Sequence, residues 1–244
     1  WERGGPERLA EVVLNHRRWG DFHLDEDELI ARFKSEDLSN AGPAIRAFFK
    51  YYAEMQDKDR WGDKTPGYVR EMVRIQSVLP EARFLHLIRD GRDVAVSLVG
   101  MNWGPDTVAG AARRWRKRVL RGRQQAPRLR NYMEVRFEDL ILNTEPTLRE
   151  ICEFIELPFD DSMLHYHQRA DKRLQEKARD LDRGPDRPPQ PAARRLASHA
   201  MTREPPDAGR VGRWRTMLSS EDQHTFEEVA GDLLAELGYE VAGN

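Results

Sequence analysis

The sequence predicts an α/β fold with a central parallel sheet flanked by helices, and three patterns carry this prediction. The stretch FLHLI at 84–88 is short, apolar and bounded by turn signals, which is typical of a buried strand. The stretch YMEVRF at 132–137 alternates and indicates a second strand. Helical patterns surround both, and the order strand, helix, helix, strand, helix is that of a three-layer α/β arrangement.

Amphipathic spacing predicts the helices in chain order. We expect helices over 6–19, 42–55, 69–79, 107–125, 144–156 and 219–238. Another helix is expected after Asp25, which forms an acidic cap pattern with Glu28, and one more begins near Asp93. Residues 171–197 differ, because they are rich in proline and nearly lack large apolar side chains. A flexible, lid-like segment is expected there.

Length and composition limit the classes of protein. The 244 residues suit one α/β domain over 1–244, and a net charge of −2 argues against non-specific binding to nucleic acid. The single Cys152 excludes an internal disulfide framework and a cysteine-rich metal site, and it suits a reducing, cytoplasmic compartment. The pair His165 and His167 lacks companion ligands, so we expect no metal. No stretch of 18 apolar residues is present to span a membrane.

The basic stretch 113–130 holds many cations and no acidic residue. Its apolar positions, among them Trp115 and Val119, lie on one helical face, so a solvated basic face is the first interpretation. The second interpretation is that this basic face binds an anionic acceptor or a nucleotide. A nucleic-acid interface is the third, because aromatic residues are not interleaved for base stacking.

The junction IRDGRDVAVS at 88–97 has the features of an anion site. Arg89 follows the predicted central strand, at the edge where open α/β sheets bind ligands. We expect Gly91 to permit a tight turn, Asp93 to cap the next helix, and Ser97 to lie on the same face one turn later. A phosphate fits this arrangement. The alternative is a structural loop in which Arg89 and Arg92 pair with Asp90 and Asp93.

The same junction resembles the 3′-phosphate-binding segment of sulfotransferases that use 3′-phosphoadenosine 5′-phosphosulfate (PAPS). The resemblance implies that Arg89 and Ser97 hold the 3′-phosphate, and that Arg92 braces the turn. Three further stretches, DKTPGYV (63–69), VRFEDLI (135–141) and GRVGRWRTMLSSED (209–222), are similar to this family in the same order and spacing. The resemblance is greatest to the bacterial and tyrosylprotein-type branch.

This resemblance implies a P-loop NTPase-like fold and transfer of a sulfuryl group from PAPS to a hydroxyl or amine of a small molecule, glycan or lipid. Lys64 is then the catalytic residue that stabilises the transferring group. Phe137 meets the adenine, and Ser198 and Arg213 touch the nucleotide, with Arg210 able to replace either contact. Trp214 is expected in the core.

The sequence departs from the family in two places. Phe137 stands where many members have tyrosine, which removes a hydrogen bond and leaves ring stacking. The family's 5′-phosphosulfate loop has no match here, nor does a Walker A pattern, and we expect the loop and a glutamate general base upstream of Trp1. His16 and His23 are weaker substitutes for that base. The alternatives are a non-catalytic nucleotide- or polyanion-binding module and a nucleotide kinase-like enzyme, which would need a Walker A loop.

Overall fold

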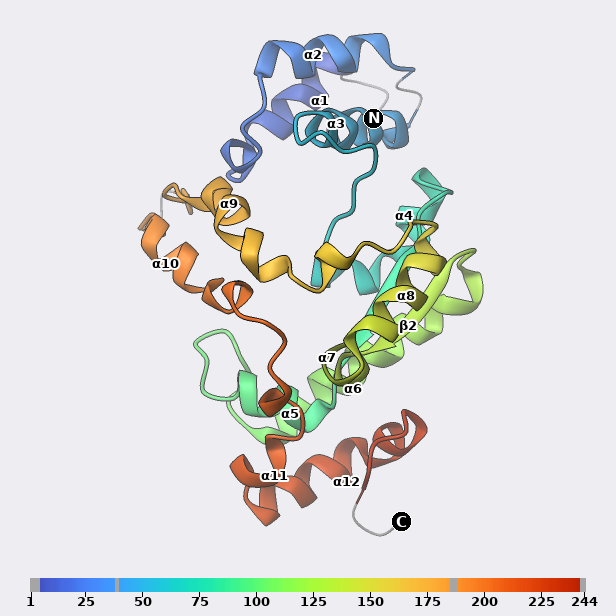
Figure 1. The fold of residues 1–244 in the computed structure, drawn as a ribbon, viewed down its shortest axis with the longest axis vertical. Helices are drawn as coiled ribbons and strands as arrows, with labels where there is room; N and C mark the ends of the chain where they lie inside the picture. The colour runs from blue at the N-terminus through green and yellow to red at the C-terminus, as the bar shows by residue number, and fades with distance from the viewer. Residues whose placement is uncertain (1–4, 38–39, 185–187, 242–244) are drawn as a thin grey trace. The chain divides into compact units, whose positions relative to one another are not determined.

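The computed structural model describes residues 5–37, 40–184 and 188–241 (Figure 1). The chain forms two compact units, each built from two stretches of sequence. Residues 1–65 and 165–205 form one of them, here called the helical unit. Residues 66–164 and 206–244 form the other, here called the sheet unit.

Three helices form the core of the helical unit: α1 (Gly5–Leu14), α2 (Glu26–Ser35) and α3 (Ala41–Glu54). Their apolar faces meet around Leu29, Phe33 and Tyr51, all of which are buried. The Asp25 side chain accepts a hydrogen bond from the Glu28 amide, so the predicted cap of α2 is confirmed. A short 3₁₀ helix, η1 (Trp19–Asp21), lies between α1 and α2.

The second stretch of the helical unit is a series of short helices. These are η5 (Tyr166–Arg169), α9 (Ala170–Leu174), η6 (Gln175–Lys177), α10 (Ala192–Ala197) and η7 (Ala200–Arg203). Leu174 and Leu181 are buried, and an antiparallel bridge joins Leu181 to Gln190. The Arg179 and Arg195 guanidinium groups both reach the carboxylate of Asp21, at 2.8 and 2.6 Å. These contacts attach the stretch to η1.

The sheet unit contains two parallel strands, β1 (Phe84–Ile88) and β2 (Tyr132–Arg136), paired from Phe84↔Tyr132 to Ile88↔Arg136. A parallel pair needs a long crossover. Here the crossover holds α5 (Gly91–Leu98) and α6 (Val108–Gln125). The remaining elements are η2 (Pro66–Arg70), α4 (Met72–Val78), η3 (Ala126–Arg128), α7 (Phe137–Leu142), α8 (Thr144–Ile155), η4 (Asp161–Met163), η8 (Ala208–Arg210), α11 (Trp214–Met217) and α12 (Ser220–Glu236).

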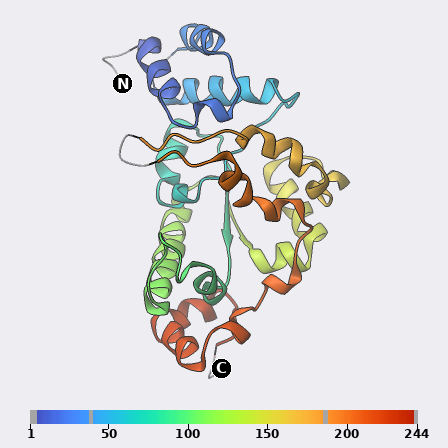
Figure 2. The ribbon, with the colours of Figure 1, turned by 90° about the vertical axis from the view of Figure 1, so that its left-hand side faces the viewer.

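The core of the sheet unit lies between the end of β1 and helices α5, α6 and α12 (Figure 2). Ile88 and Ala95 meet Trp115 of α6 and Phe226 of α12 there. Thr107 caps α6 by accepting from the Gly110 amide. The carboxyl end of β1 is therefore held on a rigid base, which suits a site that must keep its geometry.

Several predicted boundaries differ from the structure. The helix expected over 6–19 ends at Leu14, and Trp19 opens the separate 3₁₀ helix η1. Helix α5 begins at Gly91 rather than near Asp93, and its cap is Asp90, whose side chain accepts from the Arg92 amide. Strand β2 ends at Arg136, because Phe137 already opens α7.

No helix among the described residues is long and apolar enough to cross a membrane. Within those residues no group of three or more His, Cys, Asp or Glu side chains is placed to hold a metal ion.

Gly91 allows α5 to approach the core closely. A Cβ atom at this position would lie 2.5 Å from both the Phe226 and the Trp115 rings. Gly91→Ala is therefore expected to lower the free energy of unfolding by about 1–3 kcal/mol through overpacking. Gly231→Ala in α12 is the control, because its nearest contact would be 3.6 Å. Urea denaturation measures both variants, and equal stability of the two would contradict this role of Gly91.

Candidate functional site

Arg89 lies where β1 ends, and its guanidinium is held from three sides. Its Nη2 donates to the carbonyl oxygen of Arg210 at 2.6 Å and lies 3.5 Å from the Asp93 carboxylate. The ring of Phe137 stacks against it at 4.7 Å. The Nε atom is buried and finds no hydrogen-bond partner among the described residues. A buried, undonated N–H on a fixed cation is a group that an anion can satisfy.

Asp93 joins α5 to the carboxy-terminal part of the chain. Its side chain is fully buried, and its two oxygens accept from the Gly212 amide and the Trp214 amide, each at 2.9 Å. The prediction that Asp93 caps α5 is therefore wrong. Asp93 is the third residue of the helix, and its carboxylate instead fixes the turn at Gly212, whose φ of 74° is in the left-handed region.

Arg92 makes no outward contact. Its guanidinium binds Asp90 and Glu227, both at 2.8 Å, and stacks on the Trp214 ring at 3.6 Å. The side chain is 1% exposed. The interpretation of Arg92 as a brace for the turn is thus confirmed, and so is the placement of Trp214 in the core.

Glu138 ties the ends of the two strands together. One of its oxygens accepts from the Asp90 amide at 2.9 Å, and the other accepts from the Tyr239 hydroxyl at 3.0 Å. Burial, and then the nearby Glu138 carboxylate, raise the pKa of Tyr239, so this hydroxyl stays a donor. The loop that carries Arg89 is therefore fixed from the β2 side as well.

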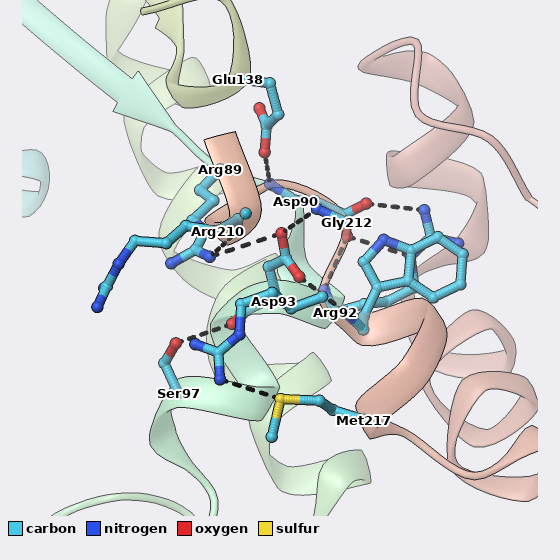
Figure 3. A network of polar contacts seen from close by, with 12 residues as sticks. Arg89, Asp90, Arg92, Asp93, Ser97, Glu138, Arg210, Gly212 and Met217 are labelled. Atoms are coloured by element: carbon cyan, nitrogen blue, oxygen red, sulfur yellow. Dashed lines mark hydrogen bonds and ion pairs between the residues drawn. The ribbon is translucent and has the colours of Figure 1, made fainter. Parts of the chain in front are cut away.

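Figure 3 shows Arg89, Arg210 and Gly212 near Asp93 in the first turn of α5, with Ser97 one turn further along the helix. The Ser97 hydroxyl donates to the Asp93 carbonyl at 3.0 Å. Of the predicted nucleotide contacts, Arg89 directly contacts the Phe137 ring and the Arg210 carbonyl, whereas Ser97 is bonded to the Asp93 carbonyl.

The other predicted site residues lie elsewhere. Arg213 donates to the Met217 sulfur at 3.0 Å, within the same unit as Arg89. Lys64 and Ser198 belong to the helical unit, where Lys64 is exposed and the Ser198 hydroxyl donates to the Arg195 carbonyl.

The sequence allows two interpretations of residues 88–97, a phosphate site and a structural loop with paired charges. Both predicted pairs exist, but they differ in kind. The Arg92 guanidinium binds two carboxylates, and each of its three nitrogens donates to one of them. Arg89 instead has a 3.5 Å contact with Asp93 and a buried Nε without a partner among the described residues. The geometry thus separates a structural arginine from one that is available to a ligand.

The model of the sulfotransferase family matches residues 6–161, which is more than half of the chain. The chain belongs to the sulfotransferase family. This match agrees with the resemblance of residues 88–97 to the 3′-phosphate-binding segment of the family. The matched range includes Lys64, Arg89 and Phe137.

Two protein-tyrosine sulfotransferases are similar in sequence to this chain. The chain is 27% identical over 116 residues to protein-tyrosine sulfotransferase A of Caenorhabditis elegans, a match that covers 43% of this chain and 30% of that protein. It is 27% identical over 154 residues to protein-tyrosine sulfotransferase of Drosophila melanogaster, with 59% of this chain and 28% of that protein covered. The chain therefore spans less than a third of the length of these relatives.

A solved structure supports the fold. The sulfotransferase domain from the curacin biosynthetic pathway superimposes with a TM-score of 0.52 at 19% identity. The superposition covers 96% of this chain and 80% of that one. The chain thus has a sulfotransferase fold with helices around a small parallel sheet.

The sequence patterns did not predict the contacts of two carboxylates at the candidate site. Glu138 follows Phe137 directly, and an acid just past a strand end is a signal for binding the amides of the neighbouring loop. No comparable signal exists for Asp93, because its partners Gly212 and Trp214 are about 120 residues away in the chain.

Proposed function

We propose that this protein transfers a sulfuryl group from PAPS to a hydroxyl or an amine of an acceptor. The observation that carries the proposal is Arg89. It is a cation fixed at the carboxyl end of β1, with a buried Nε that has no protein partner among the described residues. Family membership supports the chemistry, and the proposal assigns to Arg89 the 3′-phosphate that distinguishes PAPS from ordinary adenine nucleotides.

The residues around Arg89 fit such a nucleotide. The guanidinium is suited to bind a phosphate. The Ser97 hydroxyl, which donates to the Asp93 carbonyl within α5, is the second group that the proposal assigns to it. The Phe137 ring offers an apolar surface for adenine, and Arg210 and Arg213 supply further positive charge in the same unit. PAPS itself supplies an activated sulfuryl group.

Sulfuryl transfer resembles phosphoryl transfer, in which positioning and cationic stabilisation do most of the catalysis. In this proposal Lys64 neutralises the charge that develops at the transferring group, and Ser198 helps to orient the nucleotide. The acceptor must also lose a proton. The residue that takes it is not among the site residues proposed here.

The proposal also includes a P-loop NTPase-like, three-layer arrangement and one functional domain over 1–244. Residues 171–197 act as a lid in it, and the location is cytoplasmic. The acceptor classes are a small molecule, a glycan or a lipid. The relatives' names add tyrosine in proteins and an acceptor in a biosynthetic pathway.

The direct test is a transfer assay with PAPS and a panel of acceptors that includes simple phenols, aliphatic alcohols, amines, oligosaccharides and tyrosine peptides. Formation of 3′-phosphoadenosine 5′-phosphate together with a sulfated product is expected with at least one acceptor. Nucleotide binding without transfer to any acceptor would favour a non-catalytic binding module. Transfer of a phosphoryl group from ATP would favour a kinase-like enzyme.

A further inference from the structure

The peptide group between Arg89 and Asp90 is held at both of its polar atoms. The indole Nε1 of Trp115 donates to the Arg89 carbonyl oxygen at 3.0 Å. The Asp90 amide donates to the Glu138 carboxylate at 2.9 Å (Figure 3). Trp115 is 6% exposed and Glu138 7%, so water competes weakly for these hydrogen bonds. Because a peptide group is planar, fixing its oxygen and its N–H fixes its orientation.

This peptide group sets the direction of the Arg89 side chain. Strand β1 pairs with β2 as far as Ile88↔Arg136, which holds the backbone before Arg89. The fixed peptide holds the backbone after it. Both backbone dihedral angles of Arg89 are therefore constrained, and the guanidinium is placed before a ligand binds. Preorganisation of this kind lowers the ordering cost of binding.

Tyr239 orients the Glu138 carboxylate. The Tyr239 hydroxyl donates to the second oxygen of Glu138 at 3.0 Å. Tyr239 is itself fixed, because it is 8% exposed, its amide donates to the Leu234 carbonyl at 2.9 Å, and the Arg136 guanidinium lies over its ring at 4.6 Å. The Glu138 carboxylate thus has one oxygen for each donor, which keeps the first oxygen on the Asp90 amide.

A comparable pair in the same unit has no link to Arg89. The Tyr132 hydroxyl donates to the Glu134 carboxylate at 2.8 Å, and Glu134 also accepts from Arg123 at 2.7 Å. Within the described residues, Glu134 makes no hydrogen bond to residues 89–93. Tyr132 therefore offers a matched comparison for Tyr239.

We propose that Glu138 and Tyr239 are positioning residues for Arg89. They hold the Arg89–Asp90 peptide so that the guanidinium presents its buried Nε, which has no partner among the described residues, to a phosphate. They act through the backbone of Arg89 and not by touching the nucleotide. The inference rests on the proposed function for the identity of the phosphate, the 3′-phosphate of PAPS, and it adds two residues that set how strongly that phosphate is bound.

The ratio of two affinities tests the proposal. Calorimetry gives the dissociation constants of AMP and of 3′-phosphoadenosine 5′-phosphate, and a loss of folded protein affects both alike and cancels in their ratio. Tyr239→Phe is expected to reduce the preference for the bisphosphate by about threefold or more, through the loss of one hydrogen bond to Glu138. Tyr132→Phe removes the comparable hydrogen bond to Glu134 and is expected to leave the preference unchanged. Equal ratios in the two variants would overturn the proposal.

Glu138→Gln and Glu138→Met separate the hydrogen bonds from the charge. The glutamine oxygen can accept from the Asp90 amide while its NH₂ group donates to the Tyr239 hydroxyl oxygen, so the preference should stay within about twofold of that of the unchanged protein. Methionine has a similar length but no comparable acceptor, so Glu138→Met should lose most of the preference. Loss of the preference in Glu138→Gln, or its retention in Glu138→Met, would contradict these positioning roles.

The outcome is separable from that of the transfer assay. A bisphosphate preference that depends on Glu138 and Tyr239, without sulfuryl transfer to any acceptor, would retain the positioning roles and contradict the proposed function. Transfer by a protein whose preference is the same in all variants would retain the function and contradict this inference. Equal affinity of the unchanged protein for both nucleotides would overturn this inference together with the assignment of Arg89.

Discussion

Arg92→Met is expected to lower the free energy of unfolding by about 3–5 kcal/mol, because it removes the charge that two buried or nearly buried carboxylates bind. Asp90 and Glu227 both contact this guanidinium at 2.8 Å, and Trp214 stacks on it. Methionine retains part of the volume, so the loss reflects the charge more than a cavity. Denaturant unfolding followed by tryptophan fluorescence measures the change.

Arg116→Met is the matched control, because Arg116 also pairs with a carboxylate of α12, Asp232, but at the surface. An exposed pair contributes about 0–1 kcal/mol, so this variant is expected to differ little from the unchanged protein. If the two variants lose equal stability, Arg92 is not the brace that holds α5, α11 and α12 together.

Lys64→Ala is expected to reduce kcat for sulfuryl transfer by about 10²–10³-fold, the range found when one preorganised electrostatic contact to a transition state is removed. The affinity for the nucleotide product should change much less, because the 3′-phosphate is assigned to Arg89. Steady-state kinetics together with a binding titration separate the two effects.

Lys58→Ala is the control for Lys64, since Lys58 is an exposed lysine in the same unit and has no assigned role. It should transfer sulfuryl groups at the unchanged rate. A Lys64→Ala enzyme whose kcat stays within a few fold of the unchanged protein would remove Lys64 from the mechanism.

Local patterns predicted much of the sheet unit. The limits of β1 match the apolar run 84–88, and α6 and α12 match their amphipathic stretches within a residue or two. Each of these elements has a strong periodic signal and clear turn residues at its ends. The position of Arg89 at the end of β1 followed from the same signal.

The cap of α5 was not predictable from local pattern alone. Both Asp90 and Asp93 are good cap residues, and only tertiary packing decides between them. Gly91 lets the helix start against the Trp115 and Phe226 rings, which leaves Asp90 as the cap and turns Asp93 toward Gly212.

The cations around Asp21 were also beyond local pattern. Arg179 and Arg195 lie in a stretch whose composition predicts a flexible segment, yet both bind a carboxylate more than 150 residues earlier in the chain. Periodicity and composition carry no information on such a pairing.

The central claim is that Arg89 holds a 3′-phosphate, and calorimetry tests it most directly. The unchanged protein should bind 3′-phosphoadenosine 5′-phosphate at least about tenfold more tightly than AMP, from one or more charge-assisted hydrogen bonds of about 1.5–3 kcal/mol each. Arg89→Ala should abolish that difference while leaving the affinity for AMP nearly unchanged, and the exposed Arg113→Ala should preserve it. Equal affinity of the unchanged protein for AMP and the bisphosphate would contradict the account.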